Sequence, residues 1–377
     1  MLLGPFFLLT VVICTGFYWL LPRSIRHYAA AACALSCLAW LAPLSALFCA
    51  GLTILSYGLI RHQRSKLVIY GSAIAIFFAL LIFRELLKGS FKEQSEFSFV
   101  PWLGAAFFSL RILHCVLVIA PSTSTKPRFG EYCAYLFFPP TLLLGPFQNY
   151  ADFEREVRRS RFDSNLMSIG IERFVLGYFK IVIIGSYIFG VKCNQLLSTF
   201  APSFFRFYLE CLQYGFSLYA KFSGYSDIAI GFGLLLGIRL PENFQYPFFA
   251  KNIAEFWRNW HASVSGWCRD HVSFPIYAST RSAGVSSLVA MIVLGLWHEC
   301  SSRYLLWGTY HGIGIFVWQN WQKLTSSISW SENLLIRRIG DVASVLLTFN
   351  FVVLSFAITR SHDLDTLLQT IRRFTGE

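Results

Sequence analysis

Long apolar segments recur along nearly the whole chain, and no other feature of the sequence restricts the fold as strongly. Each is comparable to the ~20 residues that an α-helix needs to cross the hydrocarbon core of a bilayer. Backbone N–H and C=O groups meet no water at that depth, so such segments span a membrane as helices with internal hydrogen bonds. The short alternating segments of a membrane β-barrel are absent. The sequence therefore predicts an all-α, polytopic integral membrane protein.

The composition agrees with this class. Only 14% of the residues are charged and 55% are hydrophobic, whereas soluble domains carry roughly a quarter charged residues. The candidate spans are 2–21, 28–42, 44–60, 67–83, 101–120, 132–147, 168–190, 204–221, 224–238, 285–299, 304–321 and 338–358. Several are short for a full crossing, so we expect about ten to twelve transmembrane helices with short re-entrant or interfacial helices between them.

Basic residues gather in three early loops, 24–28, 61–66 and 124–128. Two candidate spans separate each loop from the next, so all three lie on one side of the membrane. The positive-inside rule makes that side cytoplasmic and places the N-terminus outside. The first segment, 2–21, has no basic region and no small-residue cleavage site, so we expect a retained span. Because the charge of +12 is spread over such clusters, we expect no nucleic-acid partner.

The ten cysteines are scattered through apolar segments and form no CxxC pair. We expect them to be small buried residues, and we expect no metal site and no bound cofactor. The sequence also contains no Gly-rich phosphate loop and no GxSxG elbow. Acid–base chemistry by histidine is the best-supported catalytic option that remains.

Polar residues crowd into one tract between positions 221 and 312, which is broken by Pro241, Pro247 and Pro275. Short helices and loops at membrane depth are tolerated only around a cavity that protein lines. We therefore expect the functional centre in this tract. No repeat or linker marks a second domain, so 1–377 is predicted to be a single membrane-embedded domain.

His298 and Glu299 stand together at the end of an apolar segment, where ionisable residues are costly and usually functional. Successive helical residues point about a quarter-turn apart, so we expect no dyad between the two. Gly295 leaves room beside the imidazole for another helix or for a ligand. A buried, neutral His298 would be able to accept a proton. The alternative is a core histidine that is hydrogen-bonded to a carbonyl group.

Three further stretches carry candidates. If 255–270 is helical, Trp257, Trp260 and His261 share one face. That helix either lines the mouth of a cavity or lies at the interface, with a Trp belt and arginine anchors. His311 is either a packing histidine beside a glycine or a second imidazole of the site. Asp227 either caps the helix that begins near it or faces the cavity together with Tyr225.

Four motifs resemble the membrane-bound O-acyltransferase family. They are "FFPPTLLLGPFQNYADFE" (137–154), "FSGYSDIAIG" (222–231), "LPENFQYPFFAKNIAEFWRNWHASVSGWCRD" (240–270) and "LGLWHECSSRYLLWGTYHG" (294–312). The resemblance is greatest to the bacterial branch that includes the alginate O-acetyltransferase membrane subunit and the teichoic-acid D-alanyl transfer protein. It implies a ring of helices around a central tunnel, with a catalytic tract at about 137–321.

The resemblance implies that His298 is the catalytic histidine and that His261 is the second histidine of the site. The residues expected to bind substrate are Trp257, Arg258, Trp260, Tyr225, Asp227, Asn243, Arg269, Trp297 and His311. Of these, Arg258 and Arg269 would receive the phosphates of a donor. Two positions depart from the family pattern: Glu299 replaces the usual glycine, and "ASTRSAG" (278–284) replaces a Gly-Gly-Asn-Arg-like loop.

The predicted function is transfer of an acyl group, most simply acetyl, to a hydroxyl of an extracytoplasmic acceptor. The resemblance implies acyl-CoA, such as acetyl-CoA, or an acylated carrier protein as the cytoplasmic donor. It implies a polysaccharide or an SGNH-type protein as partner, and membrane lipid around the chain in the bacterial inner membrane. Two alternatives stay open at this point. A transporter or lipid flippase would use the same polar tract as a path, and an inactive scaffold would tolerate Glu299.

Overall fold

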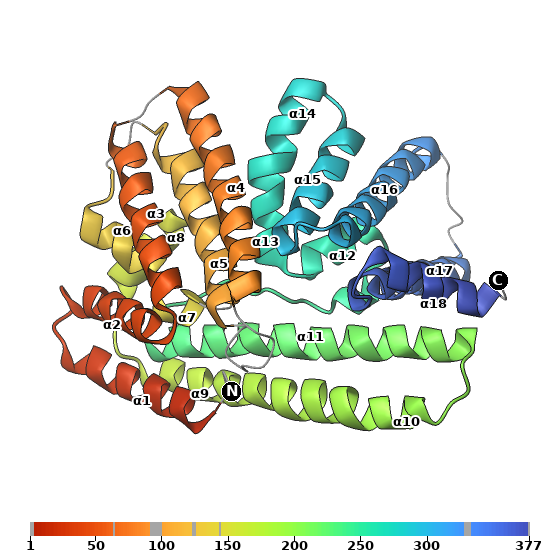
Figure 1. Cartoon of the computed structure of the whole chain (residues 1–377), viewed down its shortest axis with the longest axis horizontal. Helices are drawn as coiled ribbons and strands as arrows, with labels where there is room; N and C mark the ends of the chain where they lie inside the picture. The colour runs from red at the N-terminus through yellow and green to blue at the C-terminus, as the bar shows by residue number, and fades with distance from the viewer. Residues whose placement is uncertain are drawn as a thin grey trace. The chain divides into compact units, whose positions relative to one another are not determined.

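The computed structural model describes residues 4–62, 65–90, 100–122, 126–142, 145–327 and 333–375. Over these ranges the protein is helical and has no β-strand (Figure 1). The all-α prediction is therefore confirmed. The chain forms two compact units: unit 1 comprises Met1–Tyr178 and Tyr225–Pro241, and unit 2 comprises Phe179–Gly224 and Glu242–Glu377. That 1–377 acts as a single functional domain stays a prediction.

Unit 1 contains the N-terminal helices and the last part of α11. Their bounds are α1 Pro5–Leu20, α2 Arg26–Leu41, α3 Pro43–His62, α4 Lys66–Ser90, α5 Val100–His114, the π-helical turn η1 Cys115–Ile119, α6 Phe129–Leu136, α7 Pro139–Leu142, α8 Tyr150–Arg159 and α9 Ser164–Phe179. The predicted span 132–147 is wrong, because the chain forms the short α6 and α7 there. Gly145, with a φ of +144°, follows in a backbone conformation that residues with a Cβ rarely adopt.

Helix α11, Phe204–Leu235, is continuous. The sequence predicted two spans here, 204–221 and 224–238, and this division is wrong. The residues at their junction stay helical, and Asp227, a few residues further on, has a partner within unit 1. Arg173 of α9 donates from Nε to Oδ1 of Asp227 at 2.5 Å, and the aspartate is buried. An ion pair of this kind removes the need for the helix to end and expose the carboxylate to water.

Unit 2 contains the remaining elements. Their bounds are η2 Lys180–Cys193, α10 Asn194–Ser198, the first part of α11, η3 Pro247–Phe249, α12 Ile253–Asn259, α13 Ala262–Cys268, η4 Arg269–Ser273, α14 Phe274–Thr280, α15 Ala283–His298, α16 Ser302–Thr325, α17 Leu334–Arg360 and α18 Leu364–Thr375. Among the residues that the structure describes, four apolar helices are long enough to cross a bilayer: Pro43–His62, Lys66–Phe83, Ser164–Ser198 and Leu334–Arg360. Shorter apolar helices are Phe7–Leu20, Phe107–Ile119 and Ala283–His298. The chain is thus a multi-pass membrane protein, and the count of ten to twelve spans stays a prediction.

Helices α15 and α16 lie side by side (Figure 1), and two glycines allow the close approach. A Cβ added at Gly295 would collide with the carbonyl oxygen of Tyr304, and one at Gly308 would collide with that of Met291. The space beside Gly295 is therefore taken by a second helix, which was one of the two possibilities that the sequence left open. This packing positions the histidines that the two helices carry.

Candidate functional site

The stretch 255–270 is not one helix, and the predicted common face is wrong for His261. Helix α12 ends at Asn259, α13 begins at Ala262, and His261 lies between them with φ 49° and ψ 43°. A non-glycine residue in this left-handed conformation costs about 1–3 kcal/mol and persists only where its surroundings hold it. Here Asn243 holds it, because the backbone N–H of Ala262 donates to the Asn243 carbonyl at 2.9 Å.

The same asparagine determines which nitrogen of His261 carries a proton. Asn243 Oδ1 accepts hydrogen bonds from the backbone N–H and the hydroxyl of Ser263, at 3.2 and 2.8 Å. His261 Nδ1 lies 3.2 Å from the same oxygen. Since Oδ1 can only accept, Nδ1 is the protonated nitrogen and donates. Nε2 of the neutral ring therefore carries the lone pair.

Burial, and secondarily the charge of His298, lowers the pKa of His261 to about 3. The ring is therefore neutral at physiological pH, and it is a weak base. The effect of His298 on this pKa also means that the two imidazoles are electrostatic neighbours. They come from α15 and from the junction of α12 with α13, 37 positions apart in sequence (298 − 261 = 37).

Both rings line one cavity in unit 2, and His311 lines it as well. The rest of the wall is largely aromatic and includes Phe256, Trp257, Trp260, Tyr304, Trp307 and Phe356. Of the predicted site residues, the structure brings together the three histidines, Trp257 and Trp260. A small, mostly apolar cavity with a few convergent polar atoms is typical of a ligand site.

His298 is the last residue of α15 and is partly buried. Its ring contacts Tyr304 and Trp307, with centroids 5.9 and 5.7 Å away. Both aromatic residues come from α16, so the close approach of the two helices places them against the imidazole. His298 is thus at the edge of the cavity, where a group can be both positioned and reached.

His311 is almost fully buried on α16 and also has a defined tautomer. The Ser355 hydroxyl donates to the Val352 carbonyl at 2.7 Å, so its oxygen is left to accept. His311 Nε2 lies 3.0 Å from this oxygen and therefore donates to it. Nδ1 carries the lone pair of the neutral ring. Ser355 was not predicted, and nothing in the apolar sequence around it marks it out.

The other predicted residues lie outside the cavity wall. Asn243 is buried behind His261, and Trp297 is buried next to His298. Arg258 and Arg269 are exposed, and Arg269 pairs with its neighbour Asp270 at 2.9 Å.

Tyr225 and Asp227 belong to unit 1, whereas the cavity is walled by residues of unit 2. The helix-cap interpretation of Asp227 is wrong, because the residue lies inside α11 and pairs with Arg173.

Glu299 is paired with Arg303. The arginine Nη2 donates to Oε2 at 2.8 Å, and Nη1 donates to the carbonyl of Ser361 just beyond the end of α17. The carboxylate therefore neutralises an arginine that ties the start of α16 to the end of α17. Glu299, which stands where the family usually has a glycine, therefore has a structural partner in Arg303.

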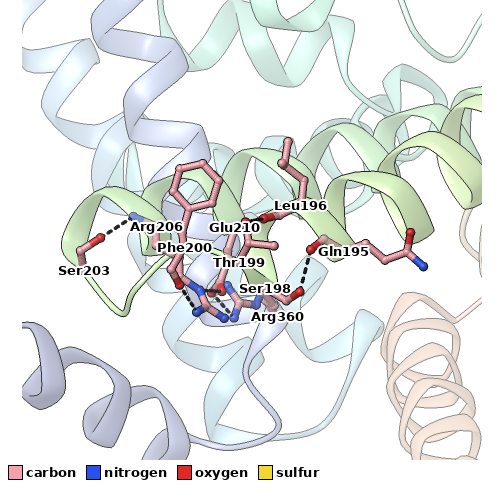
Figure 2. A network of polar contacts seen from close by, with 9 residues as sticks. All are labelled: Gln195, Leu196, Ser198, Thr199, Phe200, Ser203, Arg206, Glu210 and Arg360. Carbon is pink, nitrogen blue, oxygen red and sulfur yellow. Dashed lines mark hydrogen bonds and ion pairs between the residues drawn. The ribbon is translucent and has the colours of Figure 1, made fainter.

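A second ion-pair network holds the same end of α17 (Figure 2). Glu210 of α11 accepts from Arg206 at 2.9 Å and from Arg360 at 2.7 Å. Arg206 also donates to the Phe200 carbonyl at 2.6 Å. Arg360 follows Thr359, which lines the cavity. Both networks therefore restrain the segment of α17 that closes one side of the site.

We expect Glu299→Gln to destabilise the protein by about 1–3 kcal/mol, because it leaves a largely desolvated arginine without its counter-charge. The side chains of Arg303 and Glu299 are only 13% and 24% exposed. Glu154→Gln is the matched control, since its i,i+4 pair with Arg158 is 40% and 75% exposed. That change is expected to cost less than about 0.5 kcal/mol. Thermal unfolding in detergent measures both, and equal losses would contradict the interpretation.

The pKa of His261 also predicts how stability depends on pH. Between pH 6.5 and about 3 the unfolded chain binds a proton at this residue and the folded protein does not. Stability therefore falls as the pH falls through this window, by up to about 1.4 kcal/mol per pH unit. His261→Gln removes the titrating group. The other histidines titrate alike in both proteins, so their contributions to the pH dependence of stability cancel in the comparison. The unfolding temperature should fall more for wild type than for the variant between pH 7 and pH 5. Parallel curves would contradict the prediction.

The fold and the site together define the class of protein. It is a multi-pass helical membrane protein, and its described residues place three histidines around one aromatic cavity. The chain belongs to the membrane-bound O-acyltransferase (MBOAT) family, because the family model matches residues 55–356. The resemblance seen in the four motifs is therefore confirmed.

Curated relatives fall in the same bacterial branch. A peptidoglycan O-acetyltransferase of Helicobacter pylori is 26% identical over 268 residues, covering 69% of this chain and 50% of the relative. A probable alginate O-acetylase of Pseudomonas syringae pv. tomato is 29% identical over 267 residues, covering 70% and 49%. A teichoic acid D-alanyltransferase of Streptococcus thermophilus is 26% identical over 337 residues, covering 81% and 78%. The chain thus spans about half the length of the first two.

Proposed function

We propose that this protein is an O-acyltransferase that moves an acyl group, in the simplest case acetyl, from a cytoplasmic thioester to a hydroxyl of an extracytoplasmic acceptor. The observation that carries the proposal is the cavity itself. Its largely aromatic wall contains both His298 and His261, which match the two histidines of the family motifs. Acyl transfer needs such a site, because water would compete with the acceptor hydroxyl.

The reaction proceeds by attack of the acceptor hydroxyl oxygen on the thioester carbonyl carbon. Neutral His298 takes the hydroxyl proton as the new C–O bond forms. The C–S bond then breaks, and the imidazolium returns the proton to the departing sulfur. The products are an ester and a thiol, and His298 ends in its initial state. General base catalysis of this kind contributes about 10²–10⁴-fold.

His261 has a different role in this scheme. With a pKa of about 3 it is a poor proton acceptor at neutral pH. Its protonated nitrogen is engaged with Asn243, so the ring offers a lone pair at Nε2 and no donor. His261 therefore orients the acceptor by accepting a hydrogen bond from one of its hydroxyls, and Asn243 is the residue that positions His261.

The donor is acyl-CoA or an acylated carrier protein. The exposed Arg258 and Arg269 are candidates to bind the phosphates of that donor. The acceptor is a cell-envelope polysaccharide, or a partner protein of the SGNH type that passes the acyl group on. We assign the chain to the bacterial inner membrane with its N-terminus outside. The names of the relatives, which refer to peptidoglycan, alginate and teichoic acid, support an envelope acceptor.

The test is acylation of the cell envelope in a strain that lacks the protein. Base-labile acetyl and D-alanyl esters are released from purified envelope polysaccharide and quantified, with and without the wild-type chain. We expect one of the two esters to be lost in the deletion strain and restored by complementation. Equal ester contents in the three strains would overturn the proposal and would favour a role in transport.

A further inference from the structure

Acyl transfer requires one group that neither His261 nor His298 supplies: a hydrogen-bond donor to the thioester carbonyl oxygen. The carbonyl oxygen of the thioester becomes negatively charged as the hydroxyl attacks, and enzymes meet that charge with fixed hydrogen-bond donors. His261 presents a lone pair and not a donor at Nε2, because its proton is at Nδ1. His298 is occupied with the hydroxyl proton in the proposed scheme. The donor must come from elsewhere in the wall.

Three polar groups of the wall, those of Ser355, Thr359 and His311, do not supply it either. Ser355 donates to the carbonyl of Val352, and Thr359 donates to that of Phe356. His311 uses its N–H on Ser355 and is left with an acceptor at Nδ1. Each of these three groups uses its hydrogen-bond donor within the protein and offers only a lone pair to a ligand in the cavity.

Trp257 is different. Its indole Nε1 is buried and has no hydrogen-bond partner within the described part of the chain, although the residue is only 7% exposed and lines the cavity. An indole N–H can only donate, and an unsatisfied buried donor costs about 1–3 kcal/mol. Native proteins retain few such groups, and each one that remains calls for an explanation, of which a catalytic role is one.

The indole is also held in place on several sides. Its ring is edge-on to those of His311, Trp307 and Phe256, with centroids 5.2, 5.7 and 5.6 Å away. His311 is in turn fixed by its hydrogen bond to Ser355. A donor restrained in this way needs no reorganisation when charge develops beside it, which is the condition for electrostatic catalysis.

We propose that Trp257 is a catalytic residue whose indole N–H donates to the thioester carbonyl oxygen while that oxygen carries negative charge. The inference rests on the proposed acyl transfer and adds the oxyanion donor to it. No proton is transferred by the indole. The hydrogen bond strengthens as the hydroxyl oxygen bonds to the carbonyl carbon, and it weakens again when the C–S bond breaks and the carbonyl reforms.

The test removes the N–H and keeps the shape of the side chain. Trp257 is replaced by β-(3-benzothienyl)alanine, in which sulfur takes the place of the indole N–H, and separately by phenylalanine. Cells lacking the native gene are pulsed with ¹⁴C-acetate or D-¹⁴C-alanine, at expression low enough that the labelling rate is proportional to protein level. We expect the initial rate of base-labile envelope labelling to fall about 10²–10³-fold, as for loss of one oxyanion donor. The unfolding temperature of the purified benzothienyl variant should be unchanged.

Two tryptophans provide matched controls for the same benzothienyl replacement. Trp267 is similarly buried on α13, at 6% exposed, but does not line the cavity, and its replacement should leave labelling unchanged. Trp307 also lines the cavity and contacts both His298 and Trp257. A large loss there with none at Trp257 would overturn the assignment. A wild-type rate for the Trp257 variant, or a loss that only follows reduced stability, would overturn it as well.

The failure of this inference can be told apart from failure of the proposed function. If wild-type cells label their envelope no faster than the deletion strain with either precursor, the acyl-transfer proposal itself is wrong. If labelling requires the protein and His298 but does not change when the indole N–H of Trp257 is removed, only the assignment of Trp257 as oxyanion donor is wrong.

Discussion

Replacing His298 by alanine is expected to lower the rate of acyl transfer about 10²–10⁴-fold, because the acceptor hydroxyl then loses the base that takes its proton. The residue is the last of α15 and only partly buried, so its truncation leaves the packing between α15 and α16 in place. The labelling assay measures the rate, and blotting of the membrane fraction measures the amount of protein. We expect the variant to be present at the wild-type level.

His271→Ala is the matched control for this change. His271 is also a partly buried histidine of unit 2, and its ring lies edge-on to that of Trp267, but it does not line the cavity. Its loss should leave the rate close to that of wild type. A His298→Ala protein that transfers acyl groups at the wild-type rate would show that the histidine is structural and that the base lies elsewhere.

The second large effect is expected at Gly308, where the contact between α15 and α16 leaves no room for a side chain. A methyl group there would collide with the carbonyl oxygen of Met291 and approach Cα of Ile292 to 3.1 Å. These are backbone atoms and cannot rotate away, so the helices must separate. Overpacking of this kind costs about 1–3 kcal/mol or more. We expect Gly308→Ala to lower the unfolding temperature and to impair transfer, because His311 and Trp307 move with α16.

Gly340→Ala tests whether this effect comes from packing. Gly340 lies inside α17, and an added Cβ would meet no atom within 4 Å. Alanine is favoured over glycine in a helix by about 1 kcal/mol, so this change should raise the unfolding temperature. Shifts of the same sign at both positions would mean that helix propensity and not the interhelical contact decides the outcome at Gly308.

Much of the site was predictable because its residues stand close together in sequence motifs. His298 was expected near the end of a helix, followed by a break, and α15 does end at this residue. His311 lies one helix further on, where the motif placed it. Ser355, which fixes the tautomer of His311, comes from α17 and lies in an apolar stretch without any local signal. Such a partner is recognisable only when the chain is folded.

The arrangement around His261 was not predictable from periodicity. Helical spacing put Trp257, Trp260 and His261 on one face, but the helix ends before His261 and the backbone there is left-handed. Asn243, 18 residues earlier, stabilises that turn and directs the imidazole proton. A local pattern does not contain this information, because the energy of the turn is supplied by a residue from another segment.

The sequence by itself determined that this chain is a helical membrane protein, since its apolar segments have no other way to satisfy their backbone groups in a bilayer. It also determined the family, because the motifs with His261 and His298 occur in order along the chain. Only the tertiary structure decided what the polar atoms do. The proton of His261, the partner of Glu299 and the unsatisfied N–H of Trp257 each depend on groups brought together by folding. Hydrogen bonds act over about 3 Å, so their partners are a property of the packed protein and not of the order of its residues.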